Sequence, residues 1–274
     1  MFPSFEIFGR QIGMYGIMAV IGFAACVLVG SRLIRRYEIS MDAFALAMIF
    51  TSVCGCVCAF LLYGMTNIKT IIYAFAHFHE LGWGDFLGKF AVSFAGFVYY
   101  GGFIGSAVGL VIYTGHADSA LGHRDHLLDI YAVLMPLFHF FGRIGCFFAG
   151  CCYGIESDFG YTVHGNRFVP SVNDVNRFPV QLIESGCNLI IFLVLLYLFR
   201  KRIMEARLIY IYMLIYPVVR FIDEFFRGDV YRGIFWGLST SQWISIGLFI
   251  FALIMLPVKT KKLKKEQEYL TDTK

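Results

Sequence analysis

The sequence predicts an all-α integral membrane protein, and its composition and its apolar runs carry that prediction. Of the 274 residues, 58% are hydrophobic and only 15% are charged. The mean hydropathy of +0.69 is too high for a soluble domain, which cannot bury so much apolar surface. The apolar residues also fall in runs of about 20, the length that an α-helix needs to cross the hydrocarbon core of a bilayer. We therefore expect a polytopic bundle of transmembrane helices.

Seven apolar runs are long enough to span. They cover residues 12–34, 41–63, 90–113, 127–150, 180–199, 208–226 and 234–258. The apolar stretch 71–79 is too short for a span, and we expect it to lie in the membrane interface or to re-enter. Because no internal repeat, low-complexity tract or soluble domain is evident, residues 1–274 are predicted to form a single polytopic membrane domain with seven transmembrane helices.

The basic residues between the spans set the orientation. Arg32, Arg35 and Arg36 follow the first span, a basic triplet at 200–202 follows the fifth, and five lysines lie within 259–265. Loops rich in lysine and arginine stay in the cytoplasm, so the N-terminus is predicted outside and the C-terminus inside. The net charge of +4 then reflects this asymmetry rather than nucleic-acid binding. The N-terminus lacks the basic region and cleavage site of a signal peptide, so the first span is expected to remain as an anchor.

In this orientation two hydrophilic segments lie on opposite sides of the membrane. Residues 259–274 form a basic cytoplasmic tail, and residues 151–179 form a small extracytoplasmic insertion after the fourth span. Within the insertion, segments 161–164 and 167–170 are joined by a Gly-Asn pair, a pattern that indicates a short β-hairpin. We expect this loop or small head to cap a site within the membrane.

Two arginines lie inside stretches that otherwise have the composition of a lipid-soluble helix. Arg143 belongs to the fourth span and Arg220 to the sixth. A guanidinium near the bilayer centre costs about 2.5–3.5 kcal/mol even on the lenient insertion scale. An anion must offset that cost, and the abundant anion in a membrane is a lipid phosphate. The two arginines therefore indicate a protein that handles a phospholipid.

Other polar groups fall at a similar depth. Glu224 and Arg227 follow Arg220 at i+4 and i+7, which stacks the three side chains on one helix face. Glu224 can hold either arginine and leave at least one guanidinium to bind phosphate through two parallel hydrogen bonds. The remaining groups at this depth are Gln181, Glu184 and the Tyr-Tyr-Gly-Gly segment 99–102. Arg–Glu pairs also hold helix bundles together without any chemistry, but polar groups on four spans that converge on one leaflet favour a functional site.

Five motifs resemble those of the prolipoprotein diacylglyceryl transferase family. Residues 142–154 read Gly-Arg-Ile-Gly-Cys-Phe-Phe-Ala-Gly-Cys-Cys-Tyr-Gly, where the family has G-R-x-G-N-F-x-N-G-E-x-x-G. The others are Tyr-Gly at 15–16, Pro-Val-Gln-Leu-Ile-Glu at 179–184, Arg-Phe-Ile-Asp-Glu-Phe-Phe-Arg at 220–227, and the glycine-to-glutamine element within 237–245. They occur in the family's order over nearly the whole chain.

Such a resemblance implies an enzyme of the bacterial plasma (inner) membrane, with its active site on the extracytoplasmic side. The family transfers the diacylglyceryl group of phosphatidylglycerol to the thiol of a lipobox cysteine on an exported prolipoprotein, and glycerol 1-phosphate leaves. The implied partners are therefore phosphatidylglycerol, the prolipoprotein and the surrounding membrane lipids. The resemblance implies no metal and no organic cofactor.

The resemblance also implies roles for individual residues. Arg143 would hold the phosphatidylglycerol headgroup, while Arg220 stabilises the charge that builds on the leaving phosphate and Glu224 positions Arg220. Further headgroup contacts or orienting bonds are expected from Tyr15, Gly101, Gly102, Gln181, Glu184, Tyr216, Arg227 and Gln242.

One position departs from the family pattern in a way that bears on the acceptor. The family has a histidine before the paired glycines of the third span, where this chain has Tyr100. A phenol, with a pKa of about 10, is a poor general base at neutral pH. The nearest other candidate is His139, one helical turn before Arg143, although a histidine there is also explained by a hydrogen bond within the bundle. Both Tyr100 and His139 are therefore candidate catalytic residues.

These departures leave three functions open. The favoured one is a divergent transferase that acts on prolipoprotein cysteines, because the arginines and the motifs around them persist. The second is a paralogue that uses the same lipid donor with a sugar, polymer or small-thiol acceptor. The third is a phospholipid-binding or transport protein that kept the pocket without the chemistry.

Eight cysteines occur in the chain, and three of them lie in the longest of these motifs. Cys146 and Cys151 replace an asparagine and the glutamate of the family, and Cys152 follows directly. The three thiols are predicted to pack the helix end, although an oxidised pair or a thiol that carries a covalent intermediate is also open. Their spacing does not match a structural zinc site. Cys54 and Cys58 share a face of the second span, where small thiols favour close helix packing.

Overall fold

The computed structural model describes residues 4–7, 10–94, 96, 98–116, 123–166, 169–229 and 233–272. Most of these residues are helical, as the sequence predicts. The chain forms two compact units, one made of Met1–Leu33 and Asp129–Lys274 and the other of Ile34–Leu128. The expectation of a single polytopic domain stays a prediction.

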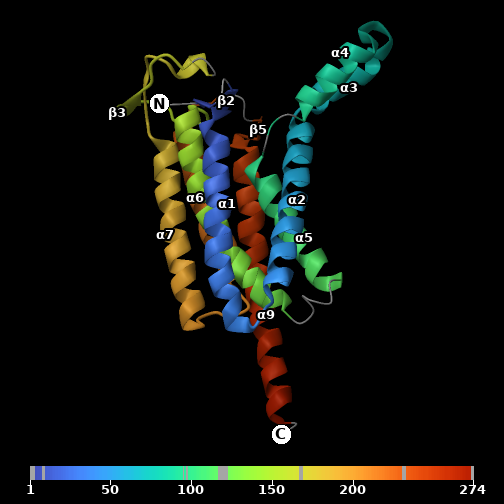
Figure 1. The fold of residues 1–274 in the computed structure, drawn as a ribbon, viewed down its shortest axis with the longest axis vertical. Helices are drawn as coiled ribbons and strands as arrows, with labels where there is room; N and C mark the ends of the chain where they lie inside the picture. Colours follow the sequence, from blue (N-terminus) through green and yellow to red (C-terminus); the bar gives the residue numbers. More distant parts are fainter. Residues whose placement is uncertain are drawn as a thin grey trace. The chain divides into compact units, whose positions relative to one another are not determined.

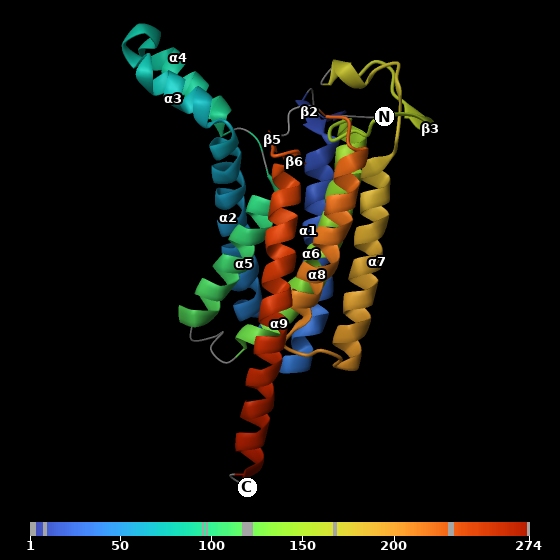
Figure 2. The same cartoon turned by 180° about the vertical axis from the view of Figure 1, so that it is seen from behind.

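Within the described residues, five α-helices build the larger unit. They are α1 (Met14–Leu33), α6 (Arg124–Ala149, which joins this unit from Asp129 onward), α7 (Val180–Lys201), α8 (Leu208–Asp223) and α9 (Thr240–Asp272). A short hairpin of β1 (Ser4–Ile7) and β2 (Arg10–Gly13) precedes α1. Figures 1 and 2 show the five helices running alongside one another. α1 approaches α6 closely because Gly22 has no side chain: a Cβ there would lie 2.9 Å from the Cβ of Phe141.

Side chains fix where α8 and α9 begin. The buried carboxylate of Asp129, on α6, accepts hydrogen bonds from the backbone N–H groups of Ala206 (2.6 Å) and Leu208 (2.8 Å) at the start of α8. At the start of α9, the backbone N–H of Ser239 donates to Oε1 of Gln242 (2.9 Å), and the N–H of Gln242 donates to Oγ of Ser239 (3.2 Å). This reciprocal pair is a capping box. Both helices therefore start at positions that specific side chains define.

The last span starts later than the sequence predicts. The chain just before α9 forms a hairpin of β5 (Ile234–Phe235) and β6 (Leu238–Ser239). Trp236 and Gly237 between them have φ angles of 51° and 78°, as a two-residue hairpin turn requires. The predicted start of the span at residue 234 is therefore wrong, because the backbone there forms the hydrogen bonds of a β-hairpin rather than those of a helix. The predicted basic tail is a continuation of α9 as far as the structure describes it.

Four α-helices make up the described part of the smaller unit. They are α2 (Met41–Thr66), α3 (Ile68–Ala76), α4 (Phe78–Ser93) and α5 (Tyr99–His116), preceded by the 3-10 turn η1 (Ile34–Tyr37). α3 and α4 lie against each other. The segment 71–79 falls in these two helices, and its predicted position at the membrane interface stays a prediction.

α2 and α5 pack closely because glycines line one face of α5. A Cβ added at Gly101 would lie 2.7 Å from the carbonyl oxygen of Cys58, and one added at Gly109 would lie 2.7 Å from the Cβ of Cys54. Only a residue without a side chain permits such an approach between helices. These contacts agree with the interpretation of Cys54 and Cys58 as packing residues.

The third predicted span, 90–113, is wrong as one continuous helix. α4 ends at Ser93 and α5 begins at Tyr99. The ring of Phe94, the residue that ends α4, packs directly over Gly64 of α2, where any side chain would clash with it. This packing holds the residue at which α4 ends against α2.

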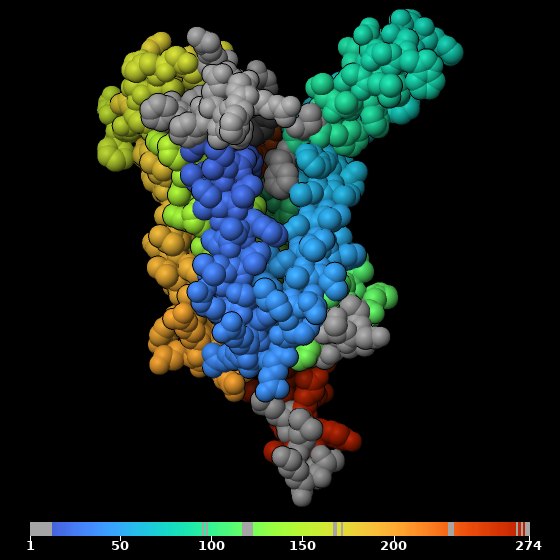
Figure 3. Space-filling view, viewed as in Figure 1, coloured from blue at the N-terminus to red at the C-terminus, as the bar shows by residue number. Residues whose placement is uncertain are grey.

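Five helical segments among the described residues are long and apolar enough to cross a membrane. They are Met14–Tyr37, Met41–Thr66, Arg124–Ala149, Val180–Lys201 and Thr240–Glu266. The predicted spans 90–113 and 208–226 correspond to the shorter helices α5 and α8, which are outside this group. Apolar side chains of α1 such as Val20 and Leu28 are exposed, as lipid contact requires, and Figure 3 shows α1 at the surface of the larger unit. The protein is thus an α-helical membrane protein, while the seven spans and their orientation stay predictions.

The insertion after α6 differs from the predicted hairpin. β3 (Glu156–Thr162) pairs antiparallel with β4 (Asn176–Arg177), and a 3-10 turn, η3 (Pro170–Val172), lies between them. The predicted pairing of 161–164 with 167–170 is therefore wrong, although residues 167 and 168 lie outside the described part of the chain.

Two asparagines explain the longer connection between the strands. The backbone N–H of Asn166 donates to Oδ1 of Asn173 (2.8 Å), and Nδ2 of Asn173 donates to the carbonyl of Asn166 (3.0 Å). Nδ2 of Asn166 also donates to the carbonyl of Ala149 (3.2 Å), the last residue of α6. The loop is therefore closed on itself and tied to the helix that carries Arg143.

Candidate functional site

The site is built around an ion pair between α6 and α7. Nη2 of Arg143 lies 2.6 Å from Oε2 of Glu184 and donates to Oε1 at 2.8 Å. Arg143 is 6% exposed and Glu184 is 1% exposed, so each charge needs the other. Nε of Arg143 is buried and has no hydrogen-bond partner within the described residues. The guanidinium therefore has a buried donor left for a ligand.

The second arginine, Arg220, also forms an ion pair, here with a glutamate in the 3-10 turn η4 (Glu224–Phe226) that follows α8. Nη2 of Arg220 lies 2.6 Å from Oε2 of Glu224 and donates to Oγ of Ser241 at 3.3 Å. This confirms the predicted i, i+4 contact between Arg220 and Glu224. Nη1 of Arg220 is buried, and among the described residues it too has no hydrogen-bond partner.

Arg227 does not continue that helix face, so the predicted stack at i, i+4 and i+7 is wrong at its third member. α8 ends at Asp223, and Arg227 has extended backbone with φ −85° and ψ 138°. The backbone there bonds to the loop after α6 instead: the N–H of Gly228 donates to the carbonyl of Tyr153 at 2.9 Å. The Arg227 side chain pairs with Asp229 at 2.6 Å rather than with Glu224.

Glu184 links the two arginine-bearing helices. The hydroxyl of Tyr216, one turn before Arg220 on α8, donates to Oε1 of Glu184 at 3.3 Å. Nε2 of His139, one turn before Arg143 on α6, lies 3.5 Å from the same oxygen. The positive charges of Arg143 and Arg220 both act on this carboxylate. The predicted convergence of the fourth and sixth spans therefore takes place around Glu184.

His139 lies where the sequence predicts, but its surroundings favour a positioning role. Its ring is 4% exposed and meets the Tyr216 ring edge to face at a centroid distance of 5.1 Å. Its closest charged neighbour is the Glu184 carboxylate, which already holds Arg143. Its role as a general base stays a prediction.

Gln181 connects the start of α7 to the loop after α6. Its Nε2 donates to the carbonyl of Cys151 at 3.0 Å, and its Oε1 accepts a hydrogen bond from the hydroxyl of Tyr161 at 3.1 Å. Burial raises the pKa of the Tyr161 phenol, so this hydroxyl keeps its proton and donates. Nothing in the sequence pattern indicated a role for Tyr161, because β3 and α7 meet only in the fold. The predicted headgroup contact of Gln181 stays a prediction.

Two further predicted site residues lie on the helices beside the arginines. α1 passes close to α6 at Tyr15, since a Cβ on Gly145 would lie 3.2 Å from the Tyr15 Cα. The Gln242 side chain takes part in the capping box of α9, and its Nε2 donates to the carbonyl of Phe221 on α8 at 3.4 Å. Its predicted contact with lipid stays a prediction.

Tyr100, Gly101 and Gly102 belong to the smaller unit. Tyr100 is buried at 2% exposure, and Gly101 is in backbone contact with α2. The roles predicted for these three residues stay predictions.

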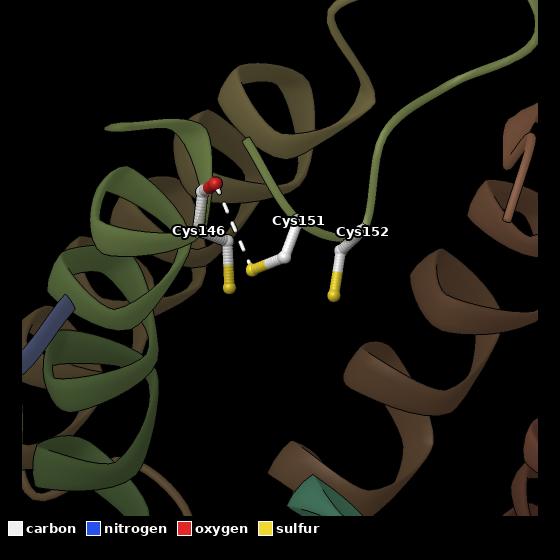
Figure 4. Close-up of side chains that lie close together, drawn as sticks. All are labelled: Cys146, Cys151 and Cys152. Atoms are coloured by element: carbon white, nitrogen blue, oxygen red, sulfur yellow. Dashed lines mark hydrogen bonds between the residues drawn. The ribbon is translucent and has the colours of Figure 1, made fainter. Parts of the chain in front are cut away.

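Three thiols gather at the end of α6. The sulfur atoms of Cys146, Cys151 and Cys152 all lie within 4.8 Å of one another, and Figure 4 shows the three side chains close together. The Cys151 thiol donates to the carbonyl of Cys146 at 3.8 Å. Linear spacing missed this cluster because it depends on a turn: Gly150 has a φ of 74° and Cys152 a φ of 55°.

These features define a class of protein, an α-helical membrane protein with two buried arginines that are each paired with a buried carboxylate. The model of the prolipoprotein diacylglyceryl transferase family matches residues 3–258. The chain belongs to this family and is a membrane-bound transferase. The resemblance seen in the sequence is thereby confirmed.

Several curated relatives carry the same name. The chain is 33% identical over 254 residues to the phosphatidylglycerol–prolipoprotein diacylglyceryl transferase of Clostridium tetani, with 90% of this chain and 95% of the relative covered. It is 32% identical to the second such transferase of Clostridium perfringens, with 95% and 96% covered. It is 28% identical to that of Campylobacter jejuni, with 94% of each covered.

Proposed function

We propose that the protein transfers the diacylglyceryl group of phosphatidylglycerol to a cysteine thiol of an exported prolipoprotein and releases glycerol 1-phosphate. The observation that carries this proposal is the pair of buried guanidinium donors, Nε of Arg143 and Nη1 of Arg220, which have no partner among the described residues. Buried donors of this kind are costly unless an acceptor meets them. A phosphate ester supplies acceptor oxygens in the geometry that a guanidinium matches. The names of the relatives are consistent with this donor and this acceptor.

The two arginines divide the work in this proposal. Arg143 binds the phosphate of the intact lipid, and Arg220 stabilises the negative charge that grows on the phosphate oxygen as its bond to the glyceryl carbon breaks. Glu184 and Glu224 each hold one guanidinium in place through a contact of 2.6 Å. Because these groups are fixed before the lipid binds, little reorganisation accompanies the reaction.

An apolar cavity in the larger unit supports a lipid substrate. It has a volume of about 270 Å³ and lies between α8 and α9. Its lining consists of Pro217, Val218, Phe221, Ile222, Ser245, Ile246, Phe249 and Ile250. Its apolar walls suit an acyl chain of the proposed lipid substrate.

The side of the membrane follows from the predicted orientation. Arg143 lies in the last third of α6, and Glu184 lies in the first turns of α7, next to the insertion 151–179. With the N-terminus outside, this end of both helices faces the extracytoplasmic leaflet, where exported prolipoproteins arrive.

A second candidate function differs only in the acceptor. Tyr100 stands where the family has a histidine, which favours a paralogue that uses the same lipid with a different nucleophile. One assay separates the two. Purified protein is incubated with phosphatidylglycerol and a lipobox peptide, and glycerol phosphate and peptide mass are measured. Both products support the prolipoprotein transferase, and glycerol phosphate without modified peptide supports the other acceptor. Bound lipid without either product contradicts both.

A further inference from the structure

We propose that Cys146, Cys151 and Cys152 bind a zinc ion through their three thiolates and leave its fourth position open for the sulfur of the acceptor cysteine. The first half of this proposal concerns a metal site at the end of α6. The second half rests on the proposed function, since it assigns the ion a role in activating the acceptor thiol.

The sulfur positions fit a metal better than any pairwise bond. In a tetrahedral site with zinc–sulfur bonds of about 2.3 Å, neighbouring sulfurs lie about 3.8 Å apart. The three sulfurs here are already within 4.8 Å of one another, so rotations of the side chains close the difference. A disulfide would join two of them at about 2.05 Å and leave the third without a partner. The proximity of all three favours a metal (Figure 4).

The backbone around the cluster is held on both sides. Nδ2 of Asn166 bonds the carbonyl of Ala149 (3.2 Å), just before the turn, and Nε2 of Gln181 bonds the carbonyl of Cys151 (3.0 Å) within it. A non-glycine residue with the φ of 55° found at Cys152 also persists only where the surroundings enforce it. Ligands on such a fixed turn keep their geometry without the ion, as a binding site requires.

The charges near the cluster match a thiolate-bound ion. Three thiolates and one divalent ion carry a net charge of −1. The positive charges of Arg227 and Arg143 both act on Cys152, which offsets this negative charge. Soft thiolate ligands select zinc or monovalent copper among the common ions. Three protein ligands with one open position are the arrangement of zinc sites that take part in catalysis.

An open position on the zinc ion would let the acceptor thiol bind as a thiolate, which is the form that acts as a nucleophile. When the acceptor thiol binds the ion, its proton leaves, because a thiol coordinated to zinc is deprotonated. The bound sulfur then forms a bond to the glyceryl carbon while the bond from that carbon to the phosphate oxygen breaks, and the electron pair stays on the phosphate. Glycerol phosphate takes up one proton, which balances the proton lost by the thiol. The product thioether is a weaker ligand than a thiolate and leaves the ion.

Metal binding is tested first, on the full-length protein in detergent after reduction and chelation. Cobalt(II) serves as the visible probe for zinc. We expect a sulfur-to-cobalt charge-transfer band that saturates at one ion per chain and disappears when zinc is added. Cys146→Ser, Cys151→Ser and Cys152→Ser should each lose the band, while Cys187→Ser, which removes a half-buried thiol of α7 outside the cluster, should keep it.

A second measurement needs no variant. Zinc should slow alkylation of the three clustered thiols in the wild-type protein, as read by mass spectrometry, and leave Cys187 unaffected. Absence of the cobalt band, retention of the band in the Cys146→Ser variant, preference for copper(I) with no zinc binding, or a disulfide within the cluster of the freshly purified protein would each overturn the metal site.

The role of the ion is tested separately, by turnover with phosphatidylglycerol and a lipobox peptide. Chelation should lower peptide modification by about tenfold or more, and zinc should restore it. Equal turnover with and without zinc overturns thiol activation and leaves the proposed function intact. No turnover in either state, together with a normal cobalt band, overturns the proposed function and leaves the metal site intact.

Discussion

The two buried arginines are held in different ways, and the difference separates what a sequence reveals from what only a fold reveals. Arg220 pairs with Glu224, four residues further along the chain. Arg143 pairs with Glu184, 41 residues away and on another helix. The local pair holds one guanidinium at the end of α8, whereas the long-range pair also joins α6 to α7. We therefore expect loss of the long-range pair to affect stability most, and changes at Arg220 to affect chemistry most.

The largest effect is expected from Glu184→Gln. This change leaves the buried Arg143 charge without its partner and should lower the free energy of unfolding by about 3–5 kcal/mol. Thermal unfolding in detergent, compared with Glu156→Gln at an exposed position of β3, measures it. The double variant Arg143→Met with Glu184→Leu should recover most of the loss, because no buried charge remains. A Glu184→Gln protein as stable as the wild type would contradict the importance of this pair.

Arg220→Lys should have the next largest effect, and on rate rather than on stability. A lysine keeps the charge but presents it as a point rather than a planar fork, so the leaving phosphate is stabilised less well. We expect kcat to fall by about 10²–10³, as for loss of one preorganised donor, while KM for phosphatidylglycerol changes little. Arg200→Lys, at the opposite end of α7, is the matched control. A change confined to KM would remove the proposed role of Arg220.

Arg143→Lys should show the opposite kinetic pattern. Because Arg143 is proposed to bind the headgroup of the intact lipid, its replacement should raise KM for phosphatidylglycerol by about tenfold, the effect of weakening a charged hydrogen bond. The kcat should fall less than in Arg220→Lys. Steady-state kinetics on both variants in the same lipid mixture make the comparison. If the two patterns are interchanged, the roles of the two arginines must be exchanged.

The smallest effect is expected from Tyr161→Phe. The change removes the hydrogen bond to Gln181 and should lower the free energy of unfolding by about 0.5–1.5 kcal/mol. Tyr197→Phe, on an exposed part of α7, should have no measurable effect. Equal stability of the two variants would show that the insertion does not brace the start of α7.

Helical periodicity and helix length were enough to predict much of this fold from the sequence. The spans that become α1, α2, α6 and α7 were found, as was the contact between Arg220 and Glu224, because both depend on residues close in the chain. The partner of Arg143 was not found, since nothing local distinguishes Glu184 from Gln181. The end of α8 at Asp223 and the pairing of β3 with β4 were also missed. Both depend on hydrogen bonds between backbone groups of segments that are distant in the sequence. The thiol cluster was missed because two positive φ angles create it.

The clamping of α8 at both ends has a mechanical consequence. Its first turn is bonded to the Asp129 carboxylate, and the segment after its last turn is bonded to residues 153–155. Because both ends of α8 are bonded to other segments, we expect the helix not to shift along its own axis and Arg220 to keep a constant depth in the membrane. Exchange of the proposed lipid substrate is then expected to involve sideways displacement of the neighbouring α9, because the side chains of α8 and α9 that line the apolar cavity are almost all hydrocarbon.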